Sequence, residues 1–214
     1  DLEYYNGTYD PHHISVNGGK VGFKTVVTLI GVGEFSFKIS ESQALYVNGA
    51  ASMPPEKPTL KDFKNFPEVV HEELSVDDHG DGLSSFDGFP KSIGGFCSLS
   101  LNGFTSLDGL SSQINGYLNL GYNKLITLKN IHKQGLRING ALGLSGNPIR
   151  SNILGLILLP GLTNVSYDDK GRGSLPEATK AFEILNRHIG KGRQGIIEAQ
   201  QELIDADLEE YAEL

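Results

Sequence analysis

The sequence is poor in several residue types and patterns that would mark a protein class. Its 214 residues include one cysteine, one methionine and no tryptophan. A lone Cys97 excludes an intramolecular disulfide and gives no support to secretion. The longest apolar run, residues 153–162, has ten residues and contains Pro160, far short of the ~20 that span a bilayer. We therefore expect neither a disulfide scaffold nor a membrane segment.

Positive charge is also scarce. The chain has 18 lysines and arginines against 26 acidic residues, which gives a net charge of −8. Binding to nucleic acid or to an anionic membrane needs a basic surplus that neutralises phosphates. We therefore expect neither as a partner. No basic and apolar signal segment opens the chain, so we expect a protein that is not secreted. The first residue is Asp1 rather than Met, which indicates a processed, a trimmed or a partial chain.

Glycine, by contrast, is abundant, with 27 residues in 214 against a usual share of ~7%. Excess glycine without low complexity is typical of a structural repeat. The repeated unit reads I-x-G-x-L-x-L-x-x-N-x-L-x-x-L-x-x-L, and its first ten positions recur at 93–102, 114–123 and 138–147, with Cys97 at the first leucine position of the first copy. The first two are 21 residues apart and the last two are 24 apart, which places a three-residue insertion near 132–135.

The residue types of this unit explain its period. Alternating apolar residues predict a half-buried strand, and the L-x-x-L-x-x-L return predicts a short irregular or 3₁₀ path with Leu107 inward. Asn102, Asn123 and Asn147 follow the strand, where a buried amide can bond the turn's own backbone groups. One coil cannot bury its apolar row alone, whereas stacked coils share a core. The unit therefore predicts a solenoid of about four coils, with a parallel sheet along one side.

Two segments give this unit a family resemblance. F-T-S-L-D-G at 104–109 and S-S-F-D-G-F-P at 84–90 resemble the compact leucine-rich repeat V-G-G-x-F-x-C-S-x-N-x-L-T-S-L-E-G-x-P, frequent in bacteriophage and bacterial proteins. The resemblance covers roughly residues 72–169. It implies an interaction scaffold, since leucine-rich repeats seldom carry chemistry themselves. The signature is lost after Asn147, where residues 151–165 predict a closing coil with a longer convex helix.

The whole chain is predicted to be an α+β protein with four regions. Residues 1–52 alternate in short runs between Asn-Gly turns, which predicts a small antiparallel sheet. Residues 53–71 are rich in proline and lysine and predict an extended connector, with Phe63 and Phe66 pinning it to the first coil. Residues 72–170 form the solenoid. Residues 171–214 predict a helical cap.

The cap prediction rests on helix signals. Ser174 and Glu177 have capping-box spacing, and Pro176 falls in the first helical turn. Apolar residues then recur at helical spacing up to Ile189, a second helix is expected over 196–206, and a third short one near Leu208. These helices would cover the apolar edge of the last coil.

The motifs that could carry chemistry are weak. G-K-G-R-Q-G at 190–195 matches a dinucleotide fingerprint but follows a helix, which favours a helix connection. Residues 77–82 resemble a calcium loop, but the twelfth position is Gly88 instead of glutamate. The neighbours His12 and His13 point apart, and Cys97 occupies an inward position. We therefore predict no catalytic residue, no metal site and no cofactor, and a protein that is not an enzyme.

The outward side of the strands is the best candidate for binding. Phe96, Tyr117 and Ala141 fall in one row among small neutral residues, and nothing on that face titrates near pH 7. Exposed aromatics on a smooth face suit contact with a protein, unless the amino-terminal sheet covers them. The partner-binding residues expected here are Phe96, Ser98, Asn115, Tyr117, Asn119 and Asn139.

A second candidate is the acidic tail. Residues 194–214 hold seven acidic residues and no basic one. They form either a solvated helix face or an acidic patch that meets a basic partner, with Glu209 and Glu210 at its centre.

These observations predict a non-enzymatic interaction or assembly protein that a bacteriophage encodes, as a virion component. The alternative is a phage inhibitor that binds and blocks a host defence protein. The partner is another protein, of phage or bacterial host, and the expected location is the virion or the cytoplasm of the infected bacterium. The sequence leaves the oligomeric state open.

Overall fold

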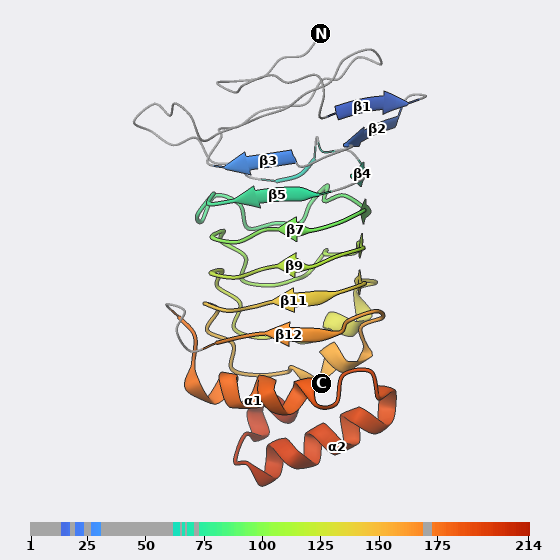
Figure 1. The fold of residues 1–214 in the computed structure, drawn as a ribbon. Helices are drawn as coiled ribbons and strands as arrows, with labels where there is room; N and C mark the ends of the chain where they lie inside the picture. The colour runs from blue at the N-terminus through green and yellow to red at the C-terminus, as the bar shows by residue number, and fades with distance from the viewer. Residues whose placement is uncertain are drawn as a thin grey trace.

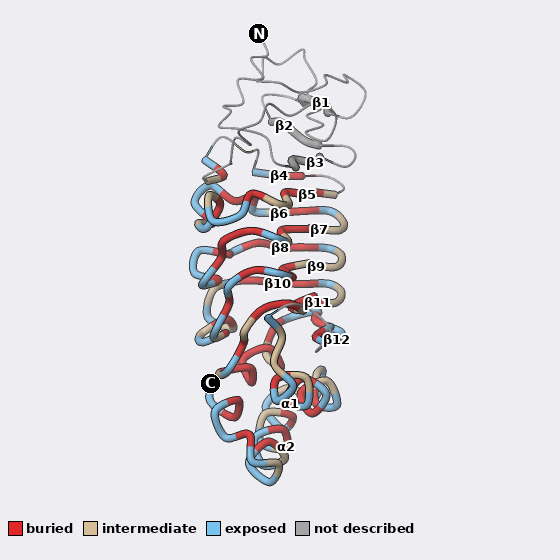
Figure 2. Tube along the Cα trace, turned by 90° about the vertical axis from the view of Figure 1, so that its left-hand side faces the viewer, coloured by how far each residue is buried: buried red, intermediate tan, exposed pale blue. Residues whose placement is uncertain are grey.

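The protein is a β-solenoid closed at one end by two α-helices, which confirms the solenoid prediction (Figure 1). The structure is a computed structural model. It describes strands at 14–17, 20–23 and 27–30, residues 62–64, 66 and 68–70, and the stretches 73–168 and 173–214. Each coil alternates between buried and exposed stretches along its path, so the core runs down the middle of the stack (Figure 2).

The coils contribute to two sheets. Sheet A contains, in spatial order, β1 (Ile14–Asn17), β2 (Lys20–Phe23), β4 (Val69–Val70), β6 (Ser92–Ile93), β8 (Gln113–Ile114) and β10 (Arg137–Ile138). Sheet B contains β3 (Val27–Ile30), β5 (Leu74–Asp77), β7 (Cys97–Ser98), β9 (Leu118–Asn119), β11 (Ala141–Gly143) and β12 (Asn164–Ser166). All the pairs are parallel except β1 with β2.

The presence of two sheets corrects the expectation of one sheet along one side. The I-x-G-x-L-x-L segment turns a corner at its glycine, so its isoleucine belongs to sheet A and its leucines belong to sheet B. A Cβ on Gly116 would lie 2.8 Å from the carbonyl carbon of Gly95, and one on Gly140 would lie 2.7 Å from the oxygen of Gly116. Glycine is therefore required at this corner because successive backbones stack there without room for a side chain.

The amino-terminal strands extend both sheets. β1 and β2 pair in antiparallel fashion. However, β2 pairs in parallel with β4, and β3 pairs in parallel with β5, so the described strands continue the solenoid instead of forming a separate sheet. β4 itself lies inside the segment that was expected to be a connector. Phe63 of that segment is fully buried, with its ring centroid 5.1 Å from that of Phe66 and 4.9 Å from that of Phe89.

A ladder of asparagines joins the coils at the far corner of sheet B. Asn123 is 5% exposed; its Nδ2 donates to the carbonyl oxygens of Leu99 (2.9 Å) and Leu120 (3.0 Å), and its Oδ1 accepts from the Phe104 N–H. Asn102 and Asn147 make the equivalent bonds in their coils. The prediction that these amides bond backbone groups is confirmed. Each amide satisfies buried peptide groups that the turn leaves open.

The return path is irregular, as predicted, and the inserted residues form the 3₁₀ helix η1 (Ile131–Lys133). Leu107 is 4% exposed and faces the core, which confirms its inward position. In the closing coil, the expected longer helix is the five-residue 3₁₀ helix η2 (Leu154–Leu158), with four of its residues buried. An almost wholly apolar segment is stable there because both the solenoid and the cap cover it.

The cap consists of α1 (Pro176–Asn186), α2 (Gly192–Asp205) and the 3₁₀ helix η3 (Glu209–Ala212). Phe182 of α1 stacks on Tyr167 at 4.8 Å between ring centroids. The capping-box prediction is wrong, because α1 has no side-chain cap and the Ser174 hydroxyl accepts the Gly146 N–H instead (2.8 Å). Pro176 is the first residue of α1, as predicted.

The cap also closes the edge of sheet B. β12 is the last strand, and Asn186 at the end of α1 lies against it. Its Oδ1 accepts the Val165 N–H (2.7 Å), and its Nδ2 donates to the Val165 oxygen (2.8 Å). One side-chain amide therefore takes the place of the next strand's peptide group at a position that would otherwise be an open edge.

Candidate functional site

The outward row of sheet B brings two predicted residues together. Phe96 and Tyr117 lie one coil apart, with ring centroids 5.7 Å apart and ring planes 22° from parallel. Both side chains are half-buried. The described amino-terminal strands extend the sheets and leave this row clear, since β3 pairs with β5 along the sheet edge (Figure 1).

Tyr117 is held on the face by its own chain. A Cβ on Gly143 would lie 1.9 Å from the Tyr117 hydroxyl oxygen, so the ring lies over that glycine in the next coil. Partial burial raises the pKa of the Tyr117 hydroxyl above its ordinary value, and the group is neutral at physiological pH. The row therefore presents an uncharged aromatic strip with a fixed position.

Beside this strip runs a polar network centred on Asp77. Its Oδ1 accepts hydrogen bonds from the Ser98 hydroxyl (2.7 Å) and from the Ser100 N–H (2.6 Å). Asn119 donates to the Ser98 hydroxyl (3.2 Å) and accepts the Gly121 N–H (3.0 Å). Ser98 is only 3% exposed, so the expectation of an open outward Ser98 is wrong. The carboxylate 21 residues earlier covers it, and these polar groups satisfy one another.

Asn115 and Asn139 lie on the other side of the glycine corner. Asn139 Nδ2 donates to Asn115 Oδ1 (2.7 Å), which also accepts from Gln113 Nε2 (3.1 Å). Arg137 Nε donates to Asn139 Oδ1 (3.3 Å). All four side chains are exposed. The structure therefore places these two asparagines on a separate polar ladder that flanks the aromatic strip across the corner.

Glu209 and Glu210 belong to a different place. They lie in η3 and line a shallow hollow of about 390 Å³ that also contains Arg150 and Tyr211. Burial, with neighbouring charges as the smaller causes, raises the pKa of the Tyr211 hydroxyl to about 12. None of the predicted strand-face residues lines this hollow. The two sequence candidates are therefore two sites, one on the solenoid body and one on the cap.

The sequence analysis missed an exposed apolar pair at the far end of the same strand segments. Leu101 is 48% exposed and Tyr122 is 47% exposed, and each precedes a ladder asparagine. Both have left-handed backbone conformations, with φ of 57° and 54°. The same corner carries Asp78 and Gly146 in the neighbouring coils, also with positive φ. The sequence signal was Gly146, because glycine in one copy of a repeat indicates a backbone that the other copies share.

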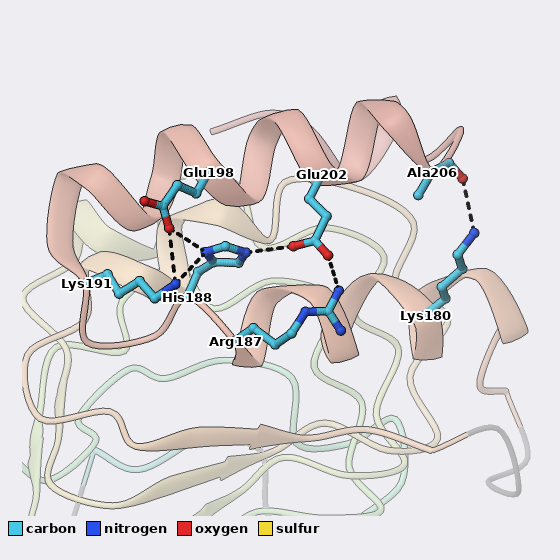
Figure 3. Close-up of polar contacts among 7 residues, drawn as sticks. All are labelled: Lys180, Arg187, His188, Lys191, Glu198, Glu202 and Ala206. Carbon is cyan, nitrogen blue, oxygen red and sulfur yellow. Dashed lines mark hydrogen bonds and ion pairs between the residues drawn. The ribbon is translucent and has the colours of Figure 1, made fainter.

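A cluster of charged side chains lies between α1 and α2 (Figure 3). His188 is 7% exposed, with Nε2 2.8 Å from Glu202 Oε2 and Nδ1 3.3 Å from Glu198 Oε2. Arg187 pairs with Glu202, and Lys191 Nζ lies 3.1 Å from Glu198 Oε2.

These contacts hold the two carboxylates in their charged form. The hydrogen bond from His188 and the Arg187 guanidinium lower the pKa of Glu202. Hydrogen bonds from Gln194 and Lys191 lower the pKa of Glu198. Each charge has a partner, and the cluster joins the end of α1 to α2, which indicates a structural role.

The remaining residues that the sequence singled out for possible chemistry are Cys97, residues 190–195, and His12 with His13. Cys97 is fully buried, and burial raises the pKa of its thiol far above the ordinary value, so it is an inert core residue. Residues 190–195 connect α1 to α2 and begin the latter. His12 and His13 lie outside the described residues. Across the part of the chain that the structure describes, no three side chains of the ligating types form a metal-binding group.

Among the helices that the structure describes, none combines the length and the apolar character that a bilayer span requires.

Comparison with known proteins adds no relative. The chain matches no protein-family model, no curated protein and no solved structure.

Proposed function

We propose that the protein is a non-enzymatic interaction and assembly protein, and that it is a component of a bacteriophage virion. The observation that carries this proposal is the exposed pair Leu101 and Tyr122. Two bulky apolar side chains stay half exposed on a backbone conformation that suits neither of them. A partner that covers them would account for both features.

The left-handed backbone of Leu101 and Tyr122 has an energetic cost. A left-handed conformation costs a residue with a branched or aromatic side chain about 1–2 kcal/mol, whereas glycine, asparagine and aspartate tolerate it. The neighbouring coils carry Asp78 and Gly146 at this corner. Backbone strain that is kept at the surface without any gain in burial is typical of a contact site.

Two apolar rows, Phe96 with Tyr117 and Leu101 with Tyr122, lie at the two ends of one surface. Phe96 and Leu101 are five residues apart at the two ends of the same strand segment, which corresponds to roughly 16 Å. The polar groups between them already bond one another through Asp77 and Ser98. A partner therefore gains most from the two apolar rows, and the stacked coils hold those rows at a fixed spacing.

We also propose a relationship to the compact leucine-rich repeats of phages and bacteria. The buried asparagine ladder and the leucine-lined return path support it. The corner between sheets A and B departs from the expected single strand. The phage origin and the virion or infected-cell location rest on this relationship.

The test compares association and stability in one variant. Leu101→Asn introduces a residue that tolerates positive φ and removes the apolar contact. We expect its free energy of unfolding to stay unchanged or to rise by up to ~1 kcal/mol, while its incorporation into purified phage particles falls. Thr105→Asn, exposed in the same coil, is the matched control and should be incorporated normally. Mass spectrometry of the particles measures copy number.

The second candidate function is inhibition of a host defence protein, which the acidic hollow at Glu209 and Glu210 favours. A basic partner would then bind the cap. Absence of the chain from purified particles, together with loss of host-protein binding in Glu209→Lys, would favour the inhibitor over the virion component. Stoichiometric copies in the particles would favour assembly.

A further inference from the structure

Helix α2 has a second apolar stripe that its own fold does not use. Gly195, Ala199 and Leu203 face inward and are buried. On the opposite side, Ile197 is 63% exposed and Ile204 is 41% exposed. Seven residues separate them, so they lie on one face two turns apart, as in the seam of a coiled coil.

We infer that this stripe is a self-association surface, on which α2 pairs in antiparallel orientation with α2 of a second copy of the chain. This inference concerns the cap and is independent of the function proposed for the solenoid body. The helix lies at the end of the molecule, below α1 and away from the sheets (Figure 1). A second copy can therefore reach it without crossing the coils.

The order of residues along the stripe is self-complementary. Gln200 and Gln201 lie at its centre, and Ile197 and Ile204 lie at equal distances from that centre. In an antiparallel pair with a two-fold axis between the glutamines, Ile197 of each copy is level with Ile204 of the other. Within its own chain, Gln200 Nε2 donates to the Ala212 oxygen (3.0 Å) and Gln201 Nε2 donates to Asp205 Oδ1 (2.8 Å). The second N–H and the Oε1 of each amide lie near the axis, where they can bond the counterpart amide.

Charge favours the antiparallel orientation over the parallel one. Among the residues that the structure describes, Arg193 at the start of the stripe has no ion-pair partner, whereas Arg187 and Lys191 are both engaged with glutamates. The carboxylates of Asp205 and Asp207 lie at the opposite end and are exposed. An antiparallel pair brings Arg193 to the acidic end of its partner, while a parallel pair would bring the two arginines together.

The small area of the apolar stripe limits the affinity of the dimer. Two isoleucines from each copy give much less than the ~800 Å² per partner that a standard stable interface buries. We therefore expect a reversible dimer whose population rises with protein concentration. Such a contact suits a protein that is present at high local density.

Sedimentation equilibrium of the full chain tests the inference. The wild type should pass from monomer to dimer as concentration rises, and Ile197→Glu should remain monomeric. Ile126→Glu is the matched control, because Ile126 is 54% exposed on the solenoid body, and it should dimerise like the wild type. A wild type that stays monomeric, or equal behaviour of the two variants, would overturn the inference.

A second measurement tests whether α2 is the surface through which the copies pair. Gln201→Cys places a thiol next to the two-fold axis, and diamide should convert the variant to disulfide-linked dimers. Glu183→Cys, exposed on α1, should not cross-link at the same rate. The native Cys97 does not interfere because it is buried. Equal cross-linking at both positions would contradict pairing through α2.

Discussion

The solenoid body and the helical cap are stabilised in different ways. Both bury an apolar core, but the polar contacts inside the body come mainly from neutral amides, such as Asn123 on the oxygens of Leu99 and Leu120. The cap instead joins α1 to α2 through charges, with His188 between Glu198 and Glu202. The body therefore depends on packing and on satisfied peptide groups, whereas the cap depends in part on protonation.

The largest expected effect would break the body's core. Leu107→Ala should lower the free energy of unfolding by ~2–5 kcal/mol, because the buried side chain leaves a cavity between stacked coils. Denaturant titration measures the loss. A change below ~0.5 kcal/mol would mean that Leu107 is not in the core and that the register of the coils is wrong.

The asparagine ladder should give the next largest effect. Asn123→Ala removes the bonds to Leu99, Leu120 and the Phe104 N–H, and leaves buried backbone groups without partners. We expect a loss of ~1–3 kcal/mol. Iodoacetamide labelling of the buried Cys97 should also become faster, because the thiol reacts only when the coils open. Full stability with lost partner binding would instead make the ladder a contact site.

The cap should show the pH dependence that the body's amide ladder does not contribute. The pKa of Glu202 is lowered in the folded state, so its contribution is present above the unfolded value of ~4.3 and is lost as pH falls through the folded value. Glu202→Gln should therefore lower stability at pH 7 by about 0.5–1 kcal/mol, since the side chain is 41% exposed and screened.

Thermal melts from pH 7 to pH 3 measure this difference. The wild type and Glu202→Gln should converge as the carboxylate becomes protonated at the acid end. A constant gap between them at every pH would mean that the variant acts through packing and that the charge contributes nothing.

The smallest expected effect on stability comes from an exposed ion pair in the solenoid body, and it tests whether the body depends on charge. Lys124 and Asp81 form an ion pair of 2.5 Å between Nζ and Oδ1, but their side chains are 55% and 76% exposed. Lys124→Ala should change the free energy of unfolding by less than ~0.5 kcal/mol. A larger loss in denaturant titration would show that the body also depends on charge.

Much of the fold could be predicted because the same residue types recur at the same positions in successive copies of the repeat. Residues 93, 114 and 138 were expected in one column, and they pair in sheet A. The corner was missed because I-x-G-x-L alternates as a single strand would. Only the stacking of Gly116 on Gly95 shows that the glycine marks a turn. The prediction of a capping box was wrong because the Ser174 hydroxyl accepts the N–H of Gly146, a residue in another coil.

The candidate site was less predictable, because it depends on contacts between coils. Strand alternation sent Phe96 and Tyr117 outward, and the structure stacks them. It also sent Ser98 outward, but Asp77 in the previous coil buries it. The pair Leu101 and Tyr122 could not be found from apolar periodicity, because their positions are defined by backbone conformation.

The amide of Asn186 has a consequence for how this molecule can change its length. The Asn186 side chain belongs to the cap and bonds the backbone of β12, the last strand of sheet B. The way in which the stack ends therefore does not depend on the number of coils that precede β12. Because each coil contacts only its neighbours, a duplication of one 21-residue unit would add ~4.8 Å to the molecule and leave both ends unaltered. The length of the stack can therefore change in steps of one coil.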